Sequence, residues 1–105
     1  SGKYSGRYPA GPSTITITLD IKSVENGTVQ GIGERQGTDQ SGQRFQRGCI
    51  GSFPLKGTAK GDSIDLQAAE KFGGSGAECQ FRIRGTVSGN KIVGKIGQND
   101  IELTK

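Results

Sequence analysis

The sequence predicts an all-β protein that forms one domain over residues 1–105, an eight-stranded antiparallel up-and-down barrel. Two segments, residues 14–24 and 77–97, carry apolar side chains at alternate positions, which is the period of a β-strand. The 19 glycines are scattered singly between β-branched residues, without the period of collagen, and this favours many short strands with tight turns. Because apolar residues make up only 30% of the chain, we expect a thin core.

The first three strands are predicted over residues 2–8, 14–24 and 28–35. Pro9 and Pro12 remove backbone donors and predict a loop over residues 9–13. In the second strand the isoleucines and the leucine share one face while threonines occupy the other, so one side is expected to be buried and the other wet. Asn26-Gly27 tolerates positive φ and predicts the next hairpin turn.

The second half of the chain continues the pattern. We expect a polar loop over residues 36–43, a long fourth strand over 44–58 that Pro54 kinks, and a fifth strand over 63–69. Residues 70–76, with the sequence EKFGGSG, predict a flexible loop that exposes Phe72. The segment 77–97 is interpreted as a β-hairpin around a turn at 88–90, and residues 100–105 as the last strand.

The predicted connections alternate in length. Short turns are expected at 25–27, 60–62 and 88–90, and longer loops at 9–13, 36–43 and 70–76. The longer loops should therefore gather at one end of the molecule. Closure into a barrel removes the exposed edges that a flat meander would leave, so a barrel is preferred, with a two-sheet sandwich as the alternative.

Cys49 and Cys79 are expected to form one structural disulfide, with two buried free thiols as the alternative. The pattern places Cys49 in the fourth strand and Cys79 in the sixth. Strands two apart lie about 9.5 Å from each other, beyond the roughly 7 Å that a disulfide spans, so the cysteines can meet only past the end of the fifth strand. Two cysteines, no histidine and a glycine-rich β pattern favour an exported protein, periplasmic or secreted.

The segment Tyr4-Ser5-Gly6-Arg7-Tyr8, followed by alternating strands with glycine-containing turns, resembles the small avidin-like and lipocalin-like barrels of exported bacterial proteins. The resemblance covers most of the chain as a layout and implies the barrel fold. Avidins hold their ligand with tryptophans and lipocalins open with a Gly-x-Trp motif, but this chain contains no tryptophan. The resemblance therefore implies neither biotin binding nor binding of an apolar ligand.

The composition excludes most classes of catalytic site. With no histidine, the chain lacks the usual proton acceptor of nucleophilic triads and the commonest ligand of zinc and haem. We expect no cofactor and no metal, and a protein that is not an enzyme. A small carboxylate-based hydrolase is kept as an alternative. Its candidate pairs are Asp62 with Asp65, Glu34 with Asp39, and Asp100 with Glu102.

Basic residues interleaved with aromatic ones form the most suggestive cluster. Arginine forks suit phosphate, sulfate or carboxylate, and a nearby ring offers stacking. The candidate ligand-binding residues are Arg35, Arg44, Phe45, Arg47, Phe72, Arg82 and Arg84. The alternative is that alternating arginines on a wet strand face pair with carboxylates and keep the barrel soluble.

These residues and a net charge of +4 predict a binding protein for a protein or an anionic surface, such as a polysaccharide or lipopolysaccharide, that acts through its long-loop end. An oligonucleotide-binding barrel that depends on Phe45 is the second hypothesis. No apolar run approaches the roughly 20 residues that a membrane helix needs, so no transmembrane segment is expected.

Overall fold

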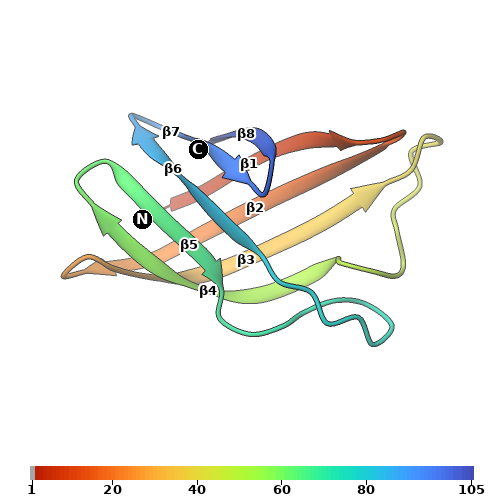
Figure 1. The fold of residues 1–105 in the computed structure, drawn as a ribbon, viewed down its shortest axis with the longest axis horizontal. Helices are drawn as coiled ribbons and strands as arrows, with labels where there is room; N and C mark the ends of the chain where they lie inside the picture. Colours follow the sequence, from red (N-terminus) through yellow and green to blue (C-terminus); the bar gives the residue numbers. More distant parts are fainter. Residues whose placement is uncertain (1) are drawn as a thin grey trace.

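The computed structural model describes residues 2–105, and in it eight antiparallel strands form a closed barrel (Figure 1). The strands follow the order of the chain, and Ser5 of the first pairs with Thr104 of the last to close the ring. Their bounds are β1 (Gly2–Ala10), β2 (Ser13–Glu25), β3 (Thr28–Thr38), β4 (Gly51–Lys60), β5 (Ser63–Ala68), β6 (Arg82–Ser88), β7 (Lys91–Ile96) and β8 (Asn99–Thr104). The predicted fold class, number of strands and topology are confirmed. Within residues 2–105, no helix has the length and hydropathy to cross a membrane.

Apolar side chains at alternate positions of the strands fill the interior of the barrel, except on β3, where Val29 is the one buried apolar side chain. In β2, Ile15, Ile17, Leu19 and Ile21 are buried, while the threonines between them are partly exposed. The same alternation continues round the barrel, so the core joins residues from all strands and from the loops. Burial of these side chains is the main driving force for folding. No charged residue belongs to this buried set in the described part of the chain.

Two inward-facing glycines show how closely the barrel is packed. A Cβ atom at Gly33 would lie 2.5 Å from the ring of Phe53, so the ring occupies the space that a side chain would need. A Cβ atom at Gly85 would collide with the backbone oxygen of Val93 on β7. Glycine at such positions lets neighbouring strands bend and approach each other, which a small barrel requires.

The β1–β2 connection is shorter than predicted. Residues 9–13 do not form a loop, because β1 continues to Ala10, Pro9 pairs with Thr14, and only Gly11 and Pro12 make the turn. Among residues 2–105, Ser5 with Thr104 is the only registered pair between β1 and β8, so Pro9 lies on an edge of the sheet, where a proline is tolerated. The predicted turn at Asn26-Gly27 is confirmed, with φ values of 53° and 80°.

Two strands begin later than the alternation predicts. β4 begins at Gly51 rather than residue 44, and β6 begins at Arg82 rather than residue 77. Gly48 and Gly51 adopt positive φ values of 91° and 121°, so the chain cannot run extended through this segment. The other connections at this end are the two-residue β7–β8 turn at Gly97 and Gln98 and two long loops. The long loops, residues 39–50 and 69–81, both lie on the right of Figure 1. We call them together the long-loop end, and their clustering was predicted.

The disulfide between Cys49 and Cys79 is confirmed, with Cα atoms 5.5 Å apart. Neither cysteine lies in a strand, contrary to the prediction, because Cys49 precedes β4 and Cys79 precedes β6. They meet beyond Ala68, where β5 ends, as the spacing argument required. The bond therefore links the two long loops directly.

Candidate functional site

The long-loop end is built from hydrogen-bonded segments rather than from free loops. Phe72 and Cys79 exchange backbone hydrogen bonds, with N···O distances of 3.1 and 2.7 Å, and so turn residues 72–79 into a small hairpin. The amide of Gly74 donates to the carbonyl of Gly48 at 2.8 Å and joins this hairpin to the other loop. Together with the disulfide, these contacts hold both loops against each other.

The other loop is organised by Asp39. One of its carboxylate oxygens accepts hydrogen bonds from the Ser41 hydroxyl at 2.7 Å and from the Ser41 and Gln43 amides at 2.9 and 3.0 Å. The Ser41 hydroxyl and these amides favour the ionised form, so they lower the pKa of Asp39 below its usual 3.8. The turn brings Arg44 back beside Thr38, at the end of β3.

Phe72 is not the exposed ring that the sequence predicted. It is 7% exposed, and its ring stacks on Phe53 with centroids 4.5 Å apart and planes 18° apart. Phe81 also packs against Phe53, with ring centroids 5.0 Å apart and planes tilted by 50°. The three rings close the barrel interior at the long-loop end. An alternation rule could not find this, because Phe72 reaches the core only when its loop folds back over β4.

Phe45 is half-buried and packs against the core, where its ring fills the space above Gly37. Its amide donates to the carbonyl of Gly37 at 2.8 Å. Phe45 therefore anchors a loop whose neighbouring side chains, Arg44 and Arg47, are exposed to solvent. In residues 2–105 neither of these arginines forms an ion pair.

Arg35 lies on the inward-facing row of β3, in register with the buried positions Gly33 and Gly37. Among the described strands, Arg35 is the one charged residue at a position that faces the barrel interior. Its Nε atom is buried and has no hydrogen-bond partner among the described residues. An unpaired buried donor costs about 1–3 kcal/mol, so an acceptor that reached Arg35 would recover part of that free energy.

Arg35 lines an open depression of about 750 Å³ where β5 and β6 meet the long-loop end. We call it the mouth depression. Inward-facing residues form one part of its lining: Tyr8, Arg35, Ala68, Phe81, Ile96 and Asn99. Residues of the outer wall and of the loop form the rest: Lys56, Gln67, Ala69, Glu70, Lys71, Gln80, Arg82 and Gly97. Four cations and one carboxylate surround this space, so its lining is predominantly basic.

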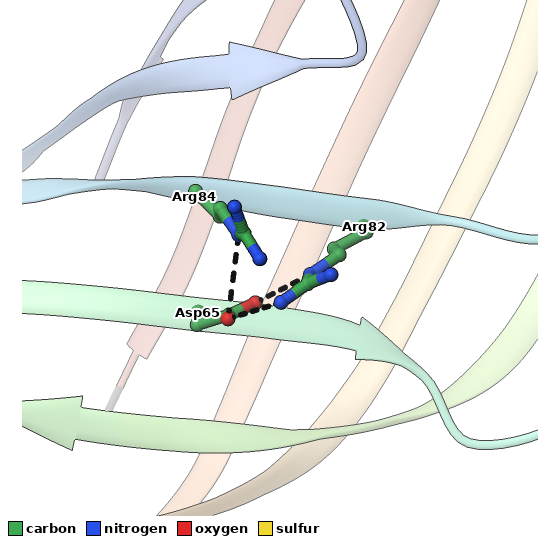
Figure 2. Close-up of polar contacts among 3 residues, drawn as sticks. All are labelled: Asp65, Arg82 and Arg84. Carbon is green, nitrogen blue, oxygen red and sulfur yellow. Dashed lines mark hydrogen bonds and ion pairs between the residues drawn. The ribbon is translucent and has the colours of Figure 1, made fainter.

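Arg82 and Arg84 project from the outer face of β6 toward Asp65 on β5 (Figure 2). Arg82 donates through Nε and one terminal nitrogen to the two oxygens of Asp65, at 2.9 and 2.6 Å, which is the bidentate geometry of a strong ion pair. Arg84 approaches the same carboxylate at 3.5 Å. The hydrogen bond from Arg82 lowers the pKa of Asp65, and the charges of both arginines add to this effect.

The seven candidate residues therefore do not form one continuous cluster. Arg35 and Arg82 line the mouth depression, Arg44 and Arg47 lie on the adjoining loop, and Arg84 lies farther along the outer wall. The two phenylalanines, Phe45 and Phe72, serve the packing of the loops. The parity of β3 could have placed Arg35 inside the barrel from the sequence.

The sequence did not predict that four other residues contribute to this region. Lys56, Lys71 and Lys95 bring further positive charge, and Asp65 pairs with the β6 arginines. The alternation of β4 and β7 could have predicted that Lys56 and Lys95 face outward. The contact between Asp65 and Arg82, in contrast, depends on the β5–β6 register. No sequence signal specifies that register at a separation of 17 residues.

The carboxylates that were considered for a hydrolase are distributed over the outer surface. Asp65 serves two arginines, Asp100 lies 3.3 Å from Lys95, and Glu102 lies 2.9 Å from Lys91. Asp39 is engaged in its turn. Over residues 2–105, no group of three or more acidic or cysteine side chains converges as a metal site would require.

Comparisons with protein-family models, with characterised proteins and with solved structures give no match to this chain.

Proposed function

We propose that this protein is an exported, non-enzymatic binding protein that engages an anionic partner through its long-loop end. The observation that carries the proposal is how the arginines are paired. In the described part of the chain Arg35, Arg44 and Arg47 have no ion pair, whereas Arg82 and Arg84 share Asp65. An unpaired guanidinium keeps its donors available for carboxylate, sulfate or phosphate oxygens.

The disulfide supports export, because such bonds persist mainly in oxidising compartments. The resemblance of the sequence layout to the avidin-like and lipocalin-like barrels of exported proteins also supports it. The packing of the barrel directs binding to its end rather than its interior, since Phe53, Phe72 and Phe81 fill the space beneath the long loops. We therefore assign the partner to the loops and the mouth depression.

The test is a double substitution, Arg44→Gln with Arg47→Gln. Binding to immobilised lipopolysaccharide and to immobilised heparin is measured over a series of salt concentrations. Each cation near an anionic surface contributes about 1 kcal/mol, so removing two should weaken binding by about 30-fold. The salt dependence should also decrease, because fewer charge contacts are left for salt to screen.

A matched control removes the same charge from the opposite end of the barrel. Lys3 and Lys60 are exposed there, and neither forms an ion pair in residues 2–105. The pair Lys3→Gln with Lys60→Gln should leave affinity nearly unchanged. If both double variants lose affinity equally, net charge alone explains binding and the assignment to the long-loop end is wrong.

A further inference from the structure

The mouth depression continues onto the outer wall of the barrel. A second, shallow depression of about 460 Å³ is lined by Arg82, Arg84, Lys95 and Gly97, and we call it the wall depression. It shares Arg82 and Gly97 with the mouth depression. The two hollows therefore form one path that begins beside Arg35, passes over the end of β5 and the start of β6, and continues to Lys95 on β7.

Positive side chains follow this path in the register of the sheet. On the outer face Lys56, Gln67 and Arg82 stand opposite one another across β4, β5 and β6. One row further along, Arg84 stands opposite Lys95 across β6 and β7. Neighbouring strands lie about 4.8 Å apart, so the cations from β4 to β7 extend over about 14 Å. This length suits an extended ligand that carries several anionic groups.

We propose that this path is a binding track for a linear acidic polysaccharide, whose sulfate or carboxylate groups meet the cations of the mouth and wall depressions. The inference depends on the proposed anion-binding function and specifies its ligand class. Sulfate and carboxylate are recognised by guanidinium and ammonium donors.

The aromatic residues distinguish this ligand from a single-stranded nucleic acid. Sequence-tolerant binding of single strands relies on bases that stack on exposed rings. Five of the six aromatic side chains are buried, namely Tyr4, Tyr8, Phe53, Phe72 and Phe81, and Phe45 is half-buried against the core. The track therefore offers charge without a stacking platform, and this favours the polysaccharide.

Two carboxylates compete with the ligand on this track, because Asp100 lies 3.3 Å from Lys95 and Asp65 holds the arginines of β6. Asp65 is the stronger competitor. It takes both donors on one side of Arg82 and also contacts Arg84, whose side chain is 67% exposed (Figure 2). An incoming sulfate must share these arginines with the carboxylate. Neutralising Asp65 should therefore free donors of two arginines without removing any cation.

The first measurement compares Asp65→Asn with Asp62→Asn by titration with a long heparin fragment. Both variants raise the net charge equally, but Asp62 lies in the β4–β5 turn at the opposite end of the barrel. Asp65→Asn should bind about threefold to fivefold more tightly than the natural protein, within the range of an exposed ion pair. Asp62→Asn should change affinity by much less. Equal gains in the two variants, or a loss in Asp65→Asn, would overturn the track.

The second measurement uses fragment length. A short heparin fragment can occupy only the mouth, whereas a long one also reaches Arg84 and Lys95. The natural protein should therefore bind the long fragment more tightly than the short one. The double variant Arg84→Gln with Lys95→Gln should lose most of this difference and bind the short fragment with unchanged affinity. If the natural protein binds both lengths equally, the track is wrong while the proposed function stands. If it binds neither heparin nor lipopolysaccharide, both proposals fail.

Single-stranded DNA of matched charge completes the comparison. It should bind more weakly than the long heparin fragment at the same salt concentration. Tighter binding of the DNA would overturn the assignment of the ligand class.

Discussion

Removal of the disulfide should lower the free energy of unfolding of this protein. The length of the loop that the bond closes sets the size of this decrease. The bond joins residues 30 positions apart, and it closes a loop that contains β4, β5 and most of the long loop over residues 69–81. In the chain-entropy model, a closed loop of this length contributes about 3.6 kcal/mol at 25 °C. Small domains have about 5–15 kcal/mol in total, so the loss is a large part of the stability.

The perturbation is the double variant Cys49→Ala with Cys79→Ala. Cys49 is exposed and Cys79 only half-buried, so the substitution should leave little cavity, and the loop-closure term should dominate. With an m-value of about 1.5 kcal/mol per molar urea, the unfolding midpoint should fall by about 2.4 M. The m-value should rise slightly, because the unfolded chain without its cross-link exposes more surface.

The assay is equilibrium urea unfolding followed by circular dichroism. The natural protein unfolded in the presence of reductant is the second measurement, and it should reproduce the midpoint of the double variant. A decrease of less than about 0.5 M in both experiments would refute the reasoning, since it would correspond to under 1 kcal/mol. The cross-link would then contribute nothing comparable to its loop-closure entropy.

Two further predictions test the packing and the electrostatics of the same region. Phe72→Ala should destabilise the protein by about 3 kcal/mol in urea unfolding, because the ring is buried against Phe53; a change below 0.5 kcal/mol would mean that the ring is exposed. NMR titration should show Asp39 and Asp65 with pKa values below the usual 3.8. Since their pKa values are lowered by folding, the stability they contribute is complete above that usual value and is lost as pH falls through the lowered values. Ordinary pKa values at both residues would contradict the Ser41 and Arg82 hydrogen bonds.

The features that the sequence predicted correctly have local physical causes. A strand alternates its side chains with a period of two, so Ile15, Ile17 and Leu19 identify a buried face without any knowledge of the neighbouring strands. Asn26-Gly27 identifies a hairpin because positive φ is a property of those residues themselves. The repetition of strand and turn along the chain predicted the barrel. The spacing between strands predicted that Cys49 and Cys79 meet beyond the end of β5.

Most of the errors have a different cause. The start of β6, the burial of Phe72 and the pairing of Asp65 with Arg82 all depend on contacts between residues that are distant in the sequence. Residues 77–81 alternate well enough for a strand, yet they are drawn into the loop hairpin by the bond between Cys79 and Cys49 and by hydrogen bonds to Phe72.

The candidate site shows the same division. The residues of the candidate site were identified from the sequence, because an excess of arginine over carboxylate is a property of composition and favours anionic partners. The geometry of the site could not be predicted from the sequence. Strand register decides which arginines pair with a carboxylate and which arginines have donors free to bind a ligand. The β5–β6 register gives Asp65 to Arg82 and Arg84, while β3 turns Arg35 inward to the mouth, where no described carboxylate pairs with it.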